Sequence, residues 1–131
     1  MNDYLEALAD KIKNTYESGV TMDEAEKLAA EFLHAQIKVA EKLADIDLTA
    51  RMRKSGYKAV AAAIYMEAAT KQEKKPSDTL LENTVLLNKV VQRERDELDA
   101  AEAQRDSLQN YFNIFKEAHI YYRGIAKGRF E

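Results

Sequence analysis

The chain has 131 residues and no cysteine, so it contains neither a disulfide framework nor a cysteine metal site. Its four glycines and single proline are too few for a sandwich or barrel of many short strands, which needs frequent turn residues. Charged residues make up 33% of the chain, and the net charge of -3 is too small to select a partner by itself. This composition favours long amphipathic helices with a narrow apolar seam.

Targeting signals are not recognisable in the sequence. The first residues lack the basic stretch and the apolar core of a secretory signal. No segment approaches the roughly 18 uncharged apolar residues that a membrane-spanning helix needs. We therefore expect a cytoplasmic protein without a membrane partner.

A short N-terminal helix is expected within residues 1–19. Asp3 and Glu6 have the spacing of a capping pair at its start. Gly19 is expected to end the helix, because glycine adopts the left-handed conformation at low cost. The apolar stripe of this helix consists of Leu5, Leu8, Ile12 and Tyr16.

A long helix is expected over residues 21–75, and it begins at the capping box formed by Thr21 and Glu24. An apolar track then repeats every three or four residues, which indicates one buried face. A glycine inside a helix costs about 1 kcal/mol relative to alanine, so the sequence does not decide whether the helix bends at residues 55–56. The track consists of Leu28, Phe32, Ala35, Val39, Leu43, Ile46, Ala50, Arg53, Tyr57, Val60, Ile64 and Ala68.

A second long helix is expected over residues 77–123, after the break at Pro76 and with Ser77 or Thr79 as its cap. Its seam has a heptad rhythm. The seam consists of Leu80, Thr84, Leu87, Val91, Glu94, Leu98, Ala101, Arg105, Leu108, Phe112, Phe115, His119 and Tyr122. Residues 124–131 are expected to form a tail.

Two long helices joined at Pro76 predict an all-α fold, a coiled-coil-like antiparallel hairpin within a single helical domain over 1–131. In this arrangement the basic residues 51–58 face the acidic residues 94–99, and the acidic residues 23–26 face the basic residues 123–129. Apolar side chains outside the seam predict a homo-oligomer. These are Leu33, Ile37, Leu81, Val85, Val90, Tyr111, Ile114 and Ile120.

A basic and aromatic stretch between residues 51 and 58 is the strongest functional signal, because it has four cations and no acid. Cations beside a ring suit single-stranded nucleic acid, which needs phosphate neutralisation and base stacking. The alternative is that these cations pair with the acids of the facing helix. The candidate nucleic-acid contacts are Arg51, Arg53, Lys54, Tyr57 and Lys58, then Lys71, Lys74 and Lys75 near the hairpin tip, and Arg123, Lys127 and Arg129 in the C-terminal run.

Catalytic patterns are weak. Glu31 and His34 have the spacing of a carboxylate-bridged metal site, but a bundle site needs two such motifs, so a surface or seam histidine is the simpler interpretation. No serine–histidine motif and no glycine-rich phosphate loop is present. We expect no enzymatic activity, no cofactor and no metal.

The layout from about residue 40 onward resembles the phage recombination mediators of the UvsY type. The corresponding pieces are the basic-aromatic stretch 58–65, the polar break 71–76, and a second helix over 96–129 whose closing segment, 115–124, is aromatic and basic. The N-terminal helix has no counterpart in this layout. The resemblance implies a non-enzymatic oligomer that binds single-stranded DNA and helps a recombinase to replace the single-strand-binding protein. It also implies DNA contacts at residues 51–58, with auxiliary contacts at the hairpin tip.

A different class of function is also compatible with the sequence. A helical structural protein, an adaptor or an inhibitor would act through protein–protein contacts without nucleic acid. In that case the basic stretch serves assembly rather than DNA.

Overall fold

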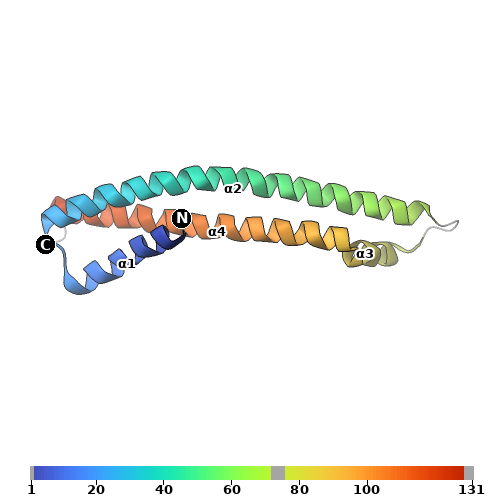
Figure 1. Cartoon of the computed structure of the whole chain (residues 1–131), viewed down its shortest axis with the longest axis horizontal. Coiled ribbons are helices and arrows are strands. Elements are labelled where there is room, and N and C mark those ends of the chain that lie inside the picture. Colours follow the sequence, from blue (N-terminus) through green and yellow to red (C-terminus); the bar gives the residue numbers. More distant parts are fainter. Residues whose placement is uncertain (1, 72–75, 129–131) are drawn as a thin grey trace. The chain divides into compact units, whose positions relative to one another are not determined.

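A computed structural model describes residues 2–71 and 76–128, which form four α-helices and no strand. The helices are α1 (Asn2–Ser18), α2 (Met22–Thr70), α3 (Asp78–Leu87) and α4 (Lys89–Ala126) (Figure 1). The expected all-α class is therefore confirmed. Of the candidate DNA contacts, Lys74, Lys75 and Arg129 lie outside the described residues.

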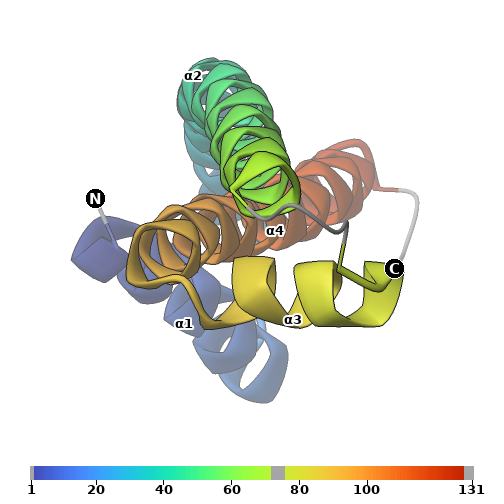
Figure 2. The same cartoon turned by 90° about the vertical axis from the view of Figure 1, so that its right-hand side faces the viewer.

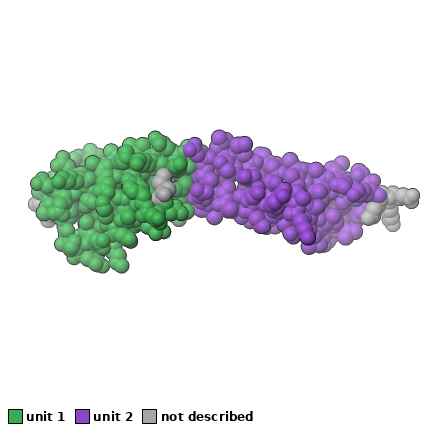
Figure 3. All heavy atoms as spheres, viewed as in Figure 1, with its two compact units in different colours: residues 1–44, 106–131 green, residues 45–105 purple. Residues whose placement is uncertain are grey.

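The chain divides into two compact units, which Figure 3 colours separately. Unit 1 comprises residues 1–44 and 106–131, and unit 2 comprises residues 45–105. Unit 1 contains α1, the first part of α2 and the last part of α4. Unit 2 contains the rest of α2, all of α3 and the beginning of α4.

Aromatic rings form the centre of unit 1. Phe32 of α2 lies between two rings of α4, with centroids 5.6 Å from Phe115 and 5.5 Å from Tyr122. All three side chains are fully buried. The Tyr122 hydroxyl forms a hydrogen bond with the Thr15 hydroxyl, so the same cluster also anchors α1.

The long helices pack antiparallel within each unit. In unit 1, Phe32 of α2 contacts Phe115 of α4, and Ala29 of α2 contacts His119 of α4. The second contact lies earlier on α2 but later on α4, so the two helices run in opposite directions. In unit 2, Arg53 pairs with Glu97. These contacts agree with the expected pairing of two long helices.

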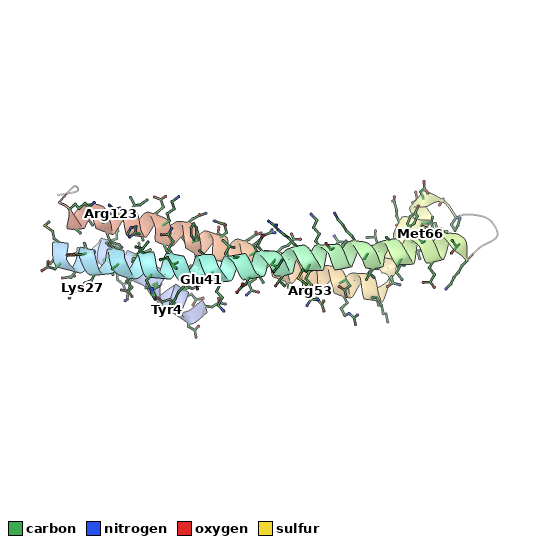
Figure 4. The ribbon with its side chains drawn as sticks, turned by 90° about the horizontal axis from the view of Figure 1, so that it is seen from above. Tyr4, Lys27, Glu41, Arg53, Met66 and Arg123 are labelled. Atoms are coloured by element: carbon green, nitrogen blue, oxygen red, sulfur yellow. The ribbon has the colours of Figure 1, made fainter. Side chains whose placement is uncertain are left out.

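The helix α1 packs through its first turns, where Leu5 and Leu8 are buried. Lys11 adds an ion pair to Glu31 of α2 at 2.7 Å, and the Lys38 ammonium lies 5.6 Å from the centre of the Tyr4 ring, which is labelled in Figure 4. The predicted stripe of α1 is wrong at Tyr16, whose side chain is 83% exposed.

Two of the predicted helix boundaries in this region are confirmed. Gly19 has a φ of +78°, and its N–H donates to the Thr15 carbonyl at 2.8 Å, which ends α1. The Thr21 hydroxyl accepts the Glu24 N–H at 3.2 Å and caps α2. Asp3 differs from the prediction, because it lies inside the first turn of α1 rather than at the cap.

The helix α2 runs without a break through Gly56. Its predicted track is buried or half-buried at every position except Arg53, which is exposed. Gly56 is tolerated because the helix is packed on both sides of it, so tertiary contacts outweigh its low helix propensity.

The second long helix differs from the prediction, because it is divided at Asn88. Ser77 caps α3 by accepting the Leu80 N–H at 3.2 Å, but α3 ends at Leu87. The Asn88 backbone is extended, with ψ of 127°, and its side-chain oxygen accepts the Val90 N–H at 2.9 Å, which starts α4. Figure 2 shows that α3 runs across the direction of α4.

This change of direction moves the apolar face of α3. The predicted seam positions Leu80, Thr84 and Leu87 are exposed, whereas Leu81 is buried with 1% exposure. From Val91 onward the predicted seam is buried or half-buried at every position. At its other end α4 continues to Ala126, so the start of the expected tail is helical.

Candidate nucleic-acid interface

Three of the predicted DNA contacts form one exposed row on α2 of unit 2. Arg51, Lys54 and Lys58 are spaced three and four residues apart, which places them on the same side of the helix. We call these three residues the cationic row. Arg51 pairs with Asp47 one turn earlier at 3.0 Å, with its side chain 76% exposed. Within residues 2–71 and 76–128, Lys54 and Lys58 form no ion pair.

Arg53 points to a different side of α2 from the cationic row. Its guanidinium donates to the Glu97 carboxylate of α4 at 2.7 Å, and Figure 4 labels this arginine on α2. This contact is the cross-helix pairing that the alternative interpretation of the basic stretch predicts. It satisfies one cation of the stretch and leaves the cationic row facing solvent.

Tyr57 follows Lys54 by three residues, but its ring packs toward α4 instead of extending into solvent with the cationic row. It is half-buried and lines a depression together with Val91, Asp96 and Asp99 of α4. Two carboxylates beside this ring disfavour a phosphate at the same place. The structure therefore places the predicted stacking ring in the seam between the helices.

Tyr65 is an aromatic neighbour of the row that was not among the predicted DNA contacts, although it ends the basic-aromatic stretch 58–65. It follows Lys58 by seven residues and so lies on the same side of α2. Its hydroxyl donates to the Asp78 carboxylate at 3.3 Å. Desolvation, followed by the charge of Asp78 and the hydrogen bond to it, raises the pKa of the Tyr65 hydroxyl above its ordinary value. In the sequence, the seven-residue spacing between Lys58 and Tyr65 is the pattern that indicates a shared side of the helix.

The other predicted DNA contacts that the structure describes, Lys71, Arg123 and Lys127, lie outside the cationic row. Lys71 is exposed and pairs with Glu67 at 2.6 Å. The hydrogen bond from Lys71, followed by its charge, lowers the pKa of the Glu67 carboxyl. Arg123 and Lys127 are exposed in unit 1, beside a buried Tyr122 that belongs to the core.

The residues of the considered metal motif have other contacts. Glu31 is engaged by Lys11, and His34 is exposed. His119 donates from Nδ1 to the Ala29 carbonyl at 2.8 Å. In the part of the chain that the structure describes, no cluster of three or more His, Asp or Glu side chains is arranged to hold a metal ion.

No described helix combines the length and the apolar character that crossing a bilayer requires.

Comparisons of the chain with protein-family models, with curated proteins and with solved structures each find no match.

Proposed function

We propose that this chain is a non-enzymatic protein that binds single-stranded DNA through the cationic row. The supporting observation is the exposure of Arg51, Lys54 and Lys58 on one side of α2, with both lysines free of ion pairs among the described residues. Such a row neutralises phosphates of the strand, and the cations condensed on those phosphates are released. Stacking on an aromatic side chain contributes about 1–3 kcal/mol per base, but Tyr57 and Tyr65 are both half-buried beside carboxylates, so the proposal rests on the phosphate contacts of the row.

The short reach of the row supports binding of a strand by more than one copy of the chain. Lys58 follows Arg51 by seven residues, so the row extends about 10 Å along the helix. One such row contacts a short piece of strand, and several copies side by side bind a longer strand more tightly. The resemblance to the UvsY-type mediators extends this proposal to recombinase loading in competition with the single-strand-binding protein.

Fluorescence anisotropy with labelled oligo-dT at several salt concentrations tests the DNA proposal. The affinity is expected to fall steeply as salt rises, because counterion release drives binding. In the variant Lys54→Gln/Lys58→Gln, the slope of log K against log salt should decrease by about 1.4, the value for two lost phosphate contacts on a single strand.

The matched control is Lys13→Gln/Lys42→Gln, which removes the same charge from exposed lysines of unit 1. This control should bind like the unmodified chain. No binding at low salt, or equal loss in both variants, would overturn the proposal.

A second candidate function is protein–protein interaction without nucleic acid. It is favoured by large apolar side chains that remain exposed near the junction of α3 and α4. Leu86, Leu87 and Val90 are 48%, 75% and 45% exposed. Apolar groups gathered in this way mark interaction surfaces. If the chain does not bind oligo-dT, we expect a protein partner to bind at this surface.

A further inference from the structure

The outer side of α2 in unit 2 carries a second heptad stripe. Its positions alternate steps of four and three residues, as the seam of a coiled coil does. All of them are exposed, and the large ones, Leu48, Met52 and Met66, are 60%, 66% and 59% exposed. We call this set the outer stripe, and it consists of Leu48, Met52, Ser55, Ala59, Ala62 and Met66.

The outer stripe is complementary to itself when two copies run antiparallel. Leu48 then faces Met66, Met52 faces Ala62, and Ser55 faces Ala59. Large residues meet at the two ends, and small residues meet in the middle, which permits two helices to approach closely there. Such pairing has the symmetry of an isologous dimer, in which both copies use the same patch.

A depression at one end of the stripe fits this arrangement. It has a volume of about 590 Å³, and its lining includes Ala62, Met66 and Leu86. The side chain that faces Met66 in the antiparallel pair is Leu48 of the second copy, which reaches the mouth of this apolar depression.

The cations on one edge of the outer stripe repel each other in the same dimer. The edge that carries Arg51 and Lys58 meets the identical edge of the second copy, so Lys58 approaches Lys58 and Arg51 approaches Tyr65. The opposite edge, with Thr49, Gly56 and Ala63, carries no charge. Two cationic rows side by side repel each other, and they are jointly complementary to a strand of phosphates.

The area of the stripe is also small for a stable dimer. Nineteen helical residues are about 28 Å long, and a helix is about 10 Å wide, which gives roughly 300 Å² per copy. Stable interfaces bury about 800 Å² per partner. Packing along the stripe therefore gives only a weak dimer, and the repulsion between the rows is enough to prevent it at low salt.

We propose that two copies of this chain pair antiparallel along the outer stripe when an anionic strand neutralises their joined cationic rows. The strand-dependent part rests on the proposed DNA function. The interface itself does not, because salt also screens the repulsion, with a Debye length of about 3 Å at 1 M. Dimerisation without DNA should therefore increase with salt, whereas DNA binding decreases with salt.

Sedimentation velocity without DNA tests the interface. The chain should be monomeric at low salt and dimeric near 1 M salt, and Lys58→Gln should dimerise at lower salt because it removes the central repulsion. Ala59→Gln should abolish the dimer by filling the close contact without changing charge, whereas Ala100→Gln, at an exposed position of α4, should not. A monomer at all salt concentrations, or equal behaviour of the two alanine variants, would overturn the interface.

Disulfide trapping tests the register, since the chain has no other cysteine. An oxidised mixture of Ser55→Cys and Ala59→Cys at high salt should form a covalent dimer, and neither variant alone should do so. Cross-linking of Ser55→Cys with itself would indicate a parallel pair and contradict the proposal.

The same mixture with oligo-dT at low salt separates the two proposals. Trapping that appears when the strand is added supports both. DNA binding by anisotropy without trapping contradicts the DNA-coupled dimer and leaves the DNA function standing. Absence of DNA binding, with trapping at high salt, contradicts the DNA function and leaves the interface.

Discussion

At the residue scale, the position of each cation on α2 decides what it is available to bind. Arg53 and Lys54 are adjacent in sequence but lie about 100° apart around the helix. Arg53 reaches Glu97 of α4, and Lys54 faces solvent without an ion pair in the described chain. Exposed ion pairs contribute little stability, so Arg53 serves the choice of helix register more than the strength of packing.

Replacing Gly19 or Gly56 by alanine should change the stability of the protein in opposite directions. Gly19→Ala should destabilise the protein by about 1–2 kcal/mol, because the residue has a φ of +78° that alanine tolerates poorly. Gly56→Ala should stabilise it by up to about 1 kcal/mol, because it lies inside a continuous helix. An added Cβ there would meet Glu94 Oε2 at 3.8 Å, an ordinary contact.

Urea unfolding of both glycine variants measures these changes. A loss of stability in Gly56→Ala would show that α2 needs glycine at this point, contrary to the account of an unbroken helix.

At the element scale, the division between α3 and α4 shows where the periodic pattern misleads. Leu87 and Val91 keep the heptad spacing across Asn88, so the pattern predicts one helix. The local chemistry of Asn88 acts against that pattern, since its side chain replaces the missing partners of the first α4 N–H groups. An asparagine before a lysine and two valines was the available signal, with no proline or glycine to reinforce it.

The Asn88 cap leads to a second stability prediction. Asn88→Ala should cost about 1 kcal/mol, because two N–H groups of α4 lose their acceptor, whereas Asn88→Asp keeps an acceptor and should stay close to the unmodified chain. Asn110→Ala, at an exposed position inside α4, is the control and should not destabilise. Thermal unfolding compares the three variants, and equal effects of Asn88→Ala and Asn88→Asp would argue against the cap.

At the scale of the whole molecule, apolar spacing predicted the helical class and most of the buried positions. The track from Leu28 to Ala68, apart from the exposed Arg53, and the seam from Val91 to Tyr122 are buried or half-buried as predicted, because one buried face per helix fixes the period. The candidate site was less predictable. Tyr57 and Lys58 are neighbours in sequence, but packing against α4 half-buries the tyrosine and leaves the lysine outside. Such separation depends on which side of α2 contacts α4.

Light scattering, which measures the mass of the protein in solution, tests the DNA-coupled dimer when it is done at low salt with and without short oligo-dT. Without DNA, we expect a single chain of 14.9 kDa. With oligo-dT, we expect a complex of two chains and one strand, because the strand neutralises both cationic rows at once. With fewer strands than chains in the mixture, complexes that contain only one chain, or the absence of any complex, would contradict the DNA-coupled dimer.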